Sequence, residues 1–222
     1  MPEAIIFQGG HLTALSLALD TVALPIEKRT ILAGLLLDFP QGRMVATDGH
    51  RLFMAALPAD TDPADPPLVL SVRNPVTGAQ VRKLPKSWKT AILDPEALTL
   101  RGGGSGPAGG EFRLEVIPEA YPTTDRIVSP YLAVAGVSSP EAARLVLNPD
   151  LLKAWSFGRE PCLDMELMLA GTFPALMVTF PHLSIPHLAL VMGMSYTPRD
   201  PRQIGGALVS GYSVPPKEAA QS

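Results

Sequence analysis

Short apolar runs alternate with polar and turn-forming residues along most of the chain. Between about His11 and Leu24, leucine and valine residues recur at helical spacing, which predicts an amphipathic helix. The apolar runs on either side of it are short and rich in Val, Leu and Ile, as is typical of strands. The first part of the chain therefore reads strand, helix, three strands, with the strands at 3–8, 31–38, 42–47 and 51–57.

The same order of elements recurs twice. VLSVRNPVTGAQVRKL (69–84) and ARLVLNPDLLKAW (143–155) each join a strand-like run to a short helical pattern through Asn-Pro. The Asn side chain can cap the helix, and Pro at the first helical position lacks only an N–H that would have no helical partner. Three strands are expected after each of these helices, at 88–93, 97–101 and 111–117 and at 163–170, 173–180 and 185–194. Each unit would have one apolar sheet face and one apolar helix stripe, so two packed units would share a core.

Composition and charge narrow the class of protein. With 46% hydrophobic and 18% charged residues the chain is globular, and its net charge of −3 gives no overall attraction to nucleic acid or acidic membranes. The single Cys162 excludes an internal disulfide. MPEAIIFQGG lacks the basic residues of a signal peptide, and no apolar run reaches the ~20 residues of a membrane span, so we expect a cytoplasmic protein without membrane contact.

MVATDGHRLFMAAL (44–57) holds the most specific local signal. Asp48-Gly49 between two apolar runs predicts a hairpin, because Gly tolerates the positive φ of a two-residue turn. A metal-dependent hydrolase that uses Asp48 and His50 is a remote alternative, since the other histidines stand in no metal-ligand spacing with them. These residues therefore predict no catalytic residue, no metal site and no cofactor.

V-A-T-D-G-H-R-L (45–52) resembles the signature hairpin of the middle domain of the bacterial sliding clamp, the β subunit of DNA polymerase III. Four further segments resemble clamp segments in the same order along the chain. They are LAGLLLDF (32–39) before the hairpin, AYPTTDRIVSP (120–130) at the end of the middle domain, LNPDLLKAW (147–155) at a helix start in the last domain, and LALVMGMSY (188–196) in the closing strand. The resemblance covers roughly residues 1–196.

The resemblance implies an α+β, sliding-clamp-like fold of strand-helix-three-strand units, with antiparallel sheets and helices on one face. Residues 1–128 would form a domain of two half units, like the middle clamp domain, and 140–196 a partial domain of one half unit, like the end of the last one. The stretch 197–222, with its Pro, Gly and charged residues, is expected to be a flexible tail. An unpaired half unit would expose an apolar face, which predicts a homo-oligomer.

In clamps, a hydrophobic pocket beside this hairpin holds short linear motifs of polymerases and repair proteins. Aliphatic walls, adaptable thioethers and a few polar rim groups suit such a ligand. The residues that match the family's pocket are Leu32, Thr47, Gly49, His50, Arg51, Leu52, Pro122, Arg126, Ile127, Asn148, Leu151, Leu176, Met192 and Met194. The chain departs from the family at Gly193-Met194-Ser195-Tyr196, where clamps have Pro-Met-Arg-Leu, so the motif preference of the pocket stays open.

The resemblance implies a non-enzymatic DNA replication or repair factor, for which two roles are open. The chain would be an oligomeric ring on double-stranded DNA, a processivity factor, or it would bind the same peptides without encircling DNA and compete with or regulate the clamp. Clamps line their hole with helices, so a ring needs basic residues there to contact phosphates. The candidates are Lys28, Arg29, Arg82, Lys83, Lys86 and Lys89, whereas helix 11–24 has no Lys or Arg and carries Asp20.

Overall fold

The computed structural model of the chain describes residues 4–22, 30–73, 81, 84–103, 110–133, 152, 155, 164–168, 175–181 and 183–192. Its helices are α1 (Gly10–Thr21), α2 (Asp125–Leu132) and two 3-10 turns, η1 (Thr30–Ala33) and η2 (Phe39–Gln41). Its strands are β1 (Ile5–Gln8), β2 (Gly34–Asp38), β3 (Arg43–Thr47), β4 (Arg51–Ala56), β5 (Leu68–Ser71), β6 (Thr90–Asp94), β7 (Thr99–Gly103), β8 (Glu111–Arg113), β9 (Glu115–Val116), β10 (Asp164–Met168), β11 (Ala175–Thr179) and β12 (His187–Met192).

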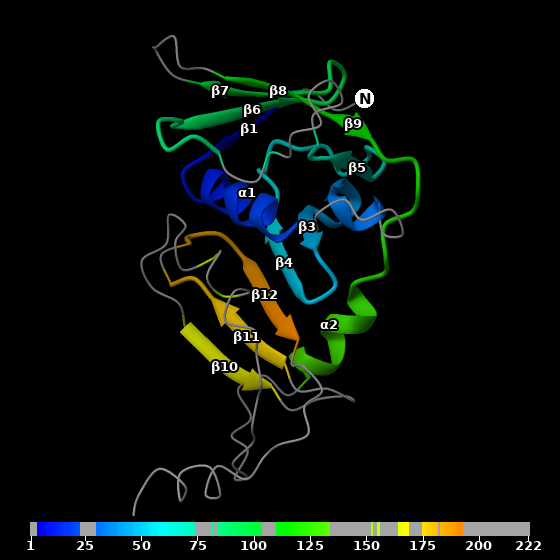
Figure 1. Cartoon of the computed structure of the whole chain (residues 1–222), viewed down its shortest axis with the longest axis vertical. Helices are drawn as coiled ribbons and strands as arrows, with labels where there is room; N and C mark the ends of the chain where they lie inside the picture. Colours follow the sequence, from blue (N-terminus) through cyan, green and yellow to red (C-terminus); the bar gives the residue numbers. More distant parts are fainter. Residues whose placement is uncertain are drawn as a thin grey trace, which may run out of the picture.

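These strands form two antiparallel sheets (Figure 1). The smaller has four strands in the order β1-β6-β7-β8, and the larger has eight in the order β10-β11-β12-β4-β3-β2-β5-β9. The predicted α+β class with antiparallel sheets is confirmed. No helix in the described part of the chain is both long and apolar enough to cross a membrane.

The first two predicted units exchange their first strands. β1 of the first unit pairs with β6 of the second, and β5 of the second pairs with β2 of the first. Each of the two sheets thus combines strands of one unit with the first strand of the other unit, so neither sheet forms from one unit alone. This exchange explains why the two units fold together.

The third unit extends the larger sheet through β12. His187–Val191 pairs antiparallel with Arg51–Ala55 of β4, and β11 and β10 follow outward in order. The predicted division into domains at 1–128 and 140–196 stays a prediction. Strands from both predicted domains belong to one continuous sheet, so the sheet does not mark a boundary between them. Both Asn-Pro pairs and the predicted tail 197–222 lie outside the described residues.

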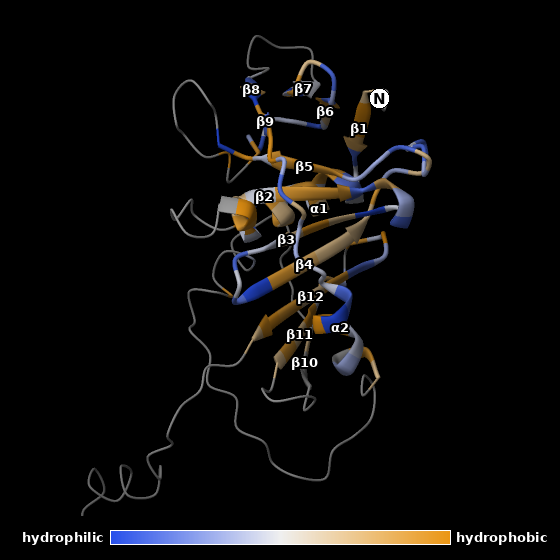
Figure 2. Cartoon of the chain, turned by 90° about the vertical axis from the view of Figure 1, so that its right-hand side faces the viewer, coloured by the Kyte–Doolittle hydropathy of each residue, from blue (hydrophilic) through white to orange (hydrophobic). Residues whose placement is uncertain are grey.

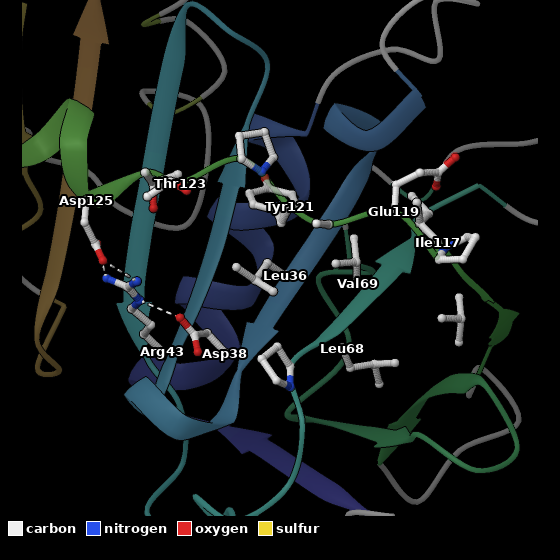
Figure 3. A pocket seen from close by; sticks show the side chains of 16 residues that line it. Leu36, Asp38, Arg43, Leu68, Val69, Ile117, Glu119, Tyr121, Thr123 and Asp125 are labelled. Atoms are coloured by element: carbon white, nitrogen blue, oxygen red, sulfur yellow. Dashed lines mark hydrogen bonds and ion pairs between the residues drawn. The ribbon is translucent and has the colours of Figure 1, made fainter.

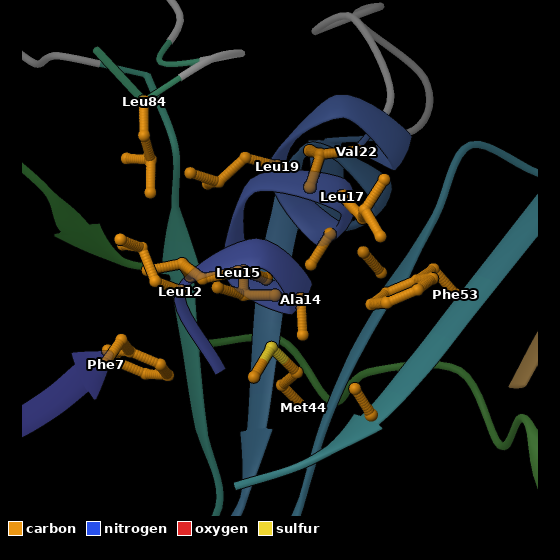
Figure 4. Packing of buried hydrophobic residues seen from close by; sticks show 14 of the residues in the cluster. Phe7, Leu12, Ala14, Leu15, Leu17, Leu19, Val22, Met44, Phe53 and Leu84 are labelled. Atoms are coloured by element: carbon orange, nitrogen blue, oxygen red, sulfur yellow. The ribbon is translucent and has the colours of Figure 1, made fainter. Parts of the chain in front are cut away.

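Helix α1 covers one face of the larger sheet. Leu12, Leu15 and Leu19 follow a 3- to 4-residue spacing, and each is buried in a cluster that also includes Leu17, Met44 and Phe53 (Figure 4). Burial of each such side chain stabilises the fold by about 1.5–3 kcal/mol. The α1 face therefore holds the main core.

A second apolar cluster lies on the opposite face of the same sheet. It contains Leu36, Val45, Leu52, Val69, Val128, Ala175 and Leu190. Val128 belongs to α2, a short helix that the sequence analysis does not predict and in which apolar and polar residues are mixed (Figure 2). Pro130 inside α2 hides it from a pattern search, because proline normally argues against a helix.

Candidate functional site

The turn between β3 and β4 is closed by the Asp48 side chain. Asp48 Oδ1 accepts the backbone N–H groups of His50, at 2.9 Å, and Arg51, at 2.7 Å. Gly49 has a φ of 87°, the left-handed region that glycine tolerates, and its N–H donates to Thr47 Oγ1 at 3.1 Å. The predicted hairpin is confirmed, but its central residues are Gly49 and His50 and not Asp48-Gly49, because the Asp48 N–H donates to the Arg51 carbonyl at 3.3 Å. Asp48 has a structural role in it.

The Arg51 side chain turns toward α1 and is buried. Its Nε lies 2.9 Å from Asp48 Oδ2, its Nη2 donates to the Asp20 carbonyl at 3.0 Å, and its guanidinium carbon is 5.6 Å from the centre of the Trp155 ring. Trp155 Nε1 in turn donates to Thr21 Oγ1 at 3.0 Å. Charge-assisted hydrogen bonds are strong, and a cation is favourable near a helix C-terminus. Arg51 therefore ties the hairpin to the end of α1 and to the third unit.

The next residue, Leu52, faces the other way. Alternation along a strand places Leu52 in the second cluster, directly opposite Leu190 of β12. The two strands are joined beyond this pair by the Met192 N–H, which donates to the His50 carbonyl at 2.8 Å. Leu52 and Leu190 are buried, whereas Met192 is partly exposed.

Helix α2 borders this region with an exposed apolar side chain. Val128 packs into the second cluster, while its neighbour Ile127 is 45% exposed. We call the partly or fully exposed apolar side chains around Leu52 and Val128 the outer apolar surface. They are Met54, Ile127, Met177, Leu188 and Met192. Thioether and branched aliphatic groups of this kind adapt to apolar ligands.

Several of the described pocket candidates lie at the outer apolar surface or on the hairpin and α2 beside it. Leu52, Ile127 and Met192 belong to its floor and border, and Gly49 and His50 are exposed at the tip of the hairpin. Thr47 ends β3, Leu32 lies in η1, and Pro122 and Arg126 are exposed before and within α2.

Two predicted pocket residues, Arg51 and Leu176, lie on the α1 face instead. Leu176 pairs with Val191 and packs against the α1-face cluster, so the structure does not bring it together with Leu52. Asn148, Leu151 and Met194 lie outside the described residues.

Sequence reasoning missed several residues of this region. Met54 and Leu188 lie on the outer face by strand alternation from Leu52 and Met192, a signal that was available once the strands were assigned. Met177 of β11 lies there through its pairing with Leu190, which the sequence does not show. Tyr121 also packs there, and burial raises the pKa of its hydroxyl above the usual value, so that it stays protonated.

Two of the six predicted DNA-contact residues belong to the described part of the chain. Lys86 and Lys89 are exposed in the turn before β6, while the other four basic candidates lie outside the described residues.

The hydrolase alternative would need Asp48 as a free ligand or base, but both of its carboxylate oxygens accept hydrogen bonds from within the hairpin. In the part of the chain that the structure describes, no three His, Cys, Asp or Glu residues form a group that could hold a metal ion.

Comparison with known proteins identifies the fold. No protein-family model matches the chain, and no curated protein matches its sequence. The DNA polymerase III β chain of Streptococcus pneumoniae matches 87% of this chain with a TM-score of 0.53 and 14% identity, and the β subunit of Streptococcus pyogenes matches 88% with 0.54 and 15%. The chain has the sliding-clamp fold.

The Helicobacter pylori β clamp bound to a DNA ligase peptide shows the same likeness, with a TM-score of 0.56 and 13% identity over 86% of this chain. The chain spans only 65% of the length of the Streptococcus pneumoniae and Helicobacter pylori clamps and 66% of the Streptococcus pyogenes one. The resemblance read from the hairpin motif is thus confirmed at the level of the fold.

Proposed function

We propose that the chain is a non-enzymatic, clamp-like factor of DNA replication or repair that binds short peptide motifs of DNA polymerases and related proteins. The main support is the outer apolar surface, which lies beside the hairpin on a sliding-clamp fold. The Helicobacter pylori clamp, which has this fold, is bound to a DNA ligase peptide, and that supports a peptide ligand here.

The surface suits an extended peptide with one or two apolar anchors. Met54, Met177 and Met192 lie in one cluster around the buried pair Leu52 and Leu190, so an anchoring Leu or Phe would rest on flexible thioethers. At the rim, the exposed side chain of Arg126 provides donors for the peptide backbone. In this proposal Arg51 positions the hairpin from the α1 face and does not touch the peptide.

A peptide titration with two matched variants tests the proposal. The probe is a fluorescein-labelled peptide with the clamp-binding motif of a bacterial replicative polymerase, and the readout is anisotropy. Met192→Lys puts a charge on the outer apolar surface and should weaken binding at least tenfold, which corresponds to about 1.4 kcal/mol. Met165→Lys is the control, because Met165 is 51% exposed and pairs with Val178 of the α1-face cluster.

The titration contradicts the proposal if the wild-type chain does not bind the peptide, or if both variants lose the same affinity. Urea unfolding of both variants has to show that the fold is kept. If Met165→Lys still binds the peptide and Met192→Lys does not, the peptide binds on the outer apolar surface.

One observation favours the role without DNA encirclement. Helix α1 has no Lys or Arg, and its partly exposed positions include Thr13, Ser16 and Asp20, which offer phosphates no cation. The alternative role is a homo-oligomeric ring, in which a second copy of the chain would supply the half unit that completes the last domain. Light scattering and retention on circular against linear DNA separate the two roles. An oligomer that stays only on circular DNA indicates a ring, whereas a monomer that binds peptide but is not retained indicates the role without encirclement.

A further inference from the structure

A groove lies on the outer face of the larger sheet, beneath a segment that crosses it (Figure 3). We call this segment, Val116 to Asp125, the strap. The Ile117 N–H donates to the Val69 carbonyl at 2.9 Å and fixes one end, and the Arg43–Asp125 ion pair at 2.7 Å fixes the other. The groove between them has a volume of about 520 Å³, within the usual range of ligand pockets.

The floor of the groove is apolar. Leu36 of β2, Val69 of β5 and Ile117 of the strap line it on the outer face, whereas Leu68, which also borders the groove, packs against the α1-face cluster. Leu36 and Val69 are each 8% exposed, so they are packed into the sheet from below and present only their upper surface. Because these two side chains are already largely covered, the free apolar area that a ligand side chain would cover belongs mainly to the partly exposed Ile117.

The strap is stiffened by proline above this floor. Pro118 and Pro122 restrict the backbone, and Thr124, next to the fixed end, is 3% exposed. The groove is therefore formed before a ligand arrives, which lowers the entropy cost of binding.

The rim of the groove is acidic. Asp38, Glu119 and Asp125 line it together with a single basic residue, Arg43. Arg43 is shared by two of these carboxylates: its Nε lies 3.1 Å from Asp38 Oδ2, and its Nη1 and Nη2 donate to Asp125 at 2.7 and 3.2 Å. The hydrogen bond from Arg43 lowers the pKa of Asp125, so this carboxylate is ionised at neutral pH. Three acidic groups against one already shared guanidinium give the groove a negative charge.

We propose that this groove binds an extended peptide segment of a partner protein in which aliphatic residues are followed by Lys or Arg. The aliphatic side chain covers Leu36 and Val69, and the cation lies among the carboxylates of the rim. An acidic peptide is repelled by the same rim. The groove shares Asp125 with α2 and Pro122 with the predicted pocket, but its floor residues Leu36 and Val69 lie on β2 and β5, whereas the outer apolar surface is carried by β4, β11, β12 and Ile127 of α2. Its charge preference is therefore tested separately from the proposed function.

Two labelled hexapeptides of opposite charge test the inference on the full chain. The basic probe is Gly-Leu-Leu-Lys-Arg-Gly, the acidic one is Gly-Leu-Leu-Glu-Asp-Gly, and methyl NMR of Ile, Leu and Val side chains reads the site. We expect the basic probe to shift the methyl signals of Leu36, Val69 and Ile117, and the acidic probe to leave them unchanged. Added salt should weaken the binding, because exposed charges are screened.

Glu119→Lys and Glu111→Lys make the matched pair of variants. Both residues are exposed, and Glu111 lies on β8 of the smaller sheet, so the two changes alter the net charge equally at different places. Glu119→Lys should weaken the affinity for the basic probe at least tenfold, and Glu111→Lys should change this affinity less than twofold. Equal binding of both probes, shifts confined to Ile127 and Leu188, or equal losses in the two variants would overturn the inference.

Discussion

The two faces of the larger sheet differ in how completely they are covered. On the α1 face, Met44 and Phe53 are 0% exposed beneath a helix of 12 residues. On the outer face, Met54, Met177 and Met192 stay partly exposed, and the covering consists of the strap and the eight residues of α2. The same strands supply both faces, because successive side chains point to opposite sides.

This difference indicates a division of roles within one sheet. The α1 face has the large, fully buried side chains, so it supplies most of the stability. The outer face keeps an acidic groove and an apolar surface open to solvent, and a partner bound there, as we propose, would leave the core undisturbed. Arg51 connects the faces, because its backbone belongs to the hairpin beside the outer surface while its side chain packs on the α1 side.

The largest effect is expected from a cavity on the α1 face. Phe53 is fully buried and makes an edge contact with Phe180 at 6.0 Å between ring centres, so Phe53→Ala should lower the free energy of unfolding by about 3–5 kcal/mol. Ile127→Ala on the outer face is the matched comparison, and it should lower the free energy of unfolding by only about 0.5 kcal/mol. Urea unfolding measures both, and similar losses in the two variants would contradict the division between the faces.

Arg51→Ala should have an intermediate effect. It removes hydrogen bonds from a buried charged group to Asp48 and to the Asp20 carbonyl, which corresponds to a loss of about 1.5–3 kcal/mol. Arg51→Lys should recover only part of the lost free energy of unfolding, because an ammonium lacks the planar fork of the guanidinium. If Arg51→Ala kept full stability but lost peptide affinity, the side chain would be a direct ligand and not a positioning residue.

The smallest effect is expected at the strap. The folded-state pKa of Asp125 lies below its ordinary value because of Arg43, so the ion pair stabilises the fold above the unfolded-state pKa and is lost as the pH falls through the folded-state one. The carboxylate is 58% exposed, which limits the contribution to roughly 0–1 kcal/mol. The difference in unfolding free energy between wild type and Asp125→Asn should be present at neutral pH and shrink below about pH 4. A difference that stays constant into acid would show that the ion pair does not fix the strap.

Much of the fold follows from local patterns in the sequence. Apolar periodicity predicts α1 and nearly all of the described strands to within a few residues, and Asp48-Gly49 predicts the hairpin. These features depend on neighbouring residues, whose spacing is visible in the sequence. The resemblance to clamps adds the identity of the fold.

Other features depend on contacts between distant residues, and the sequence does not show them. The exchange of β1 and β5 between units, the α1-side position of the Arg51 side chain and the groove under the strap all arise from tertiary placement. Leu176 illustrates the limit: a resemblance assigns it to the pocket, but the register of β11 turns it to the other face. A shift of one residue reverses the face of every side chain in a strand.

Methionine methyl NMR tests the division between the faces most directly, because methionines lie on both. With ¹³C-methyl methionine in the full chain and the polymerase clamp-motif peptide added, the signals of Met177 and Met192 on the outer face should shift. Those of Met44, fully buried under α1, and Met165, exposed beside the α1-face cluster, should stay in place. Shifts at Met44 and Met165 without shifts at Met192, or no shifts at all at saturating peptide, would contradict the proposed role of the outer face.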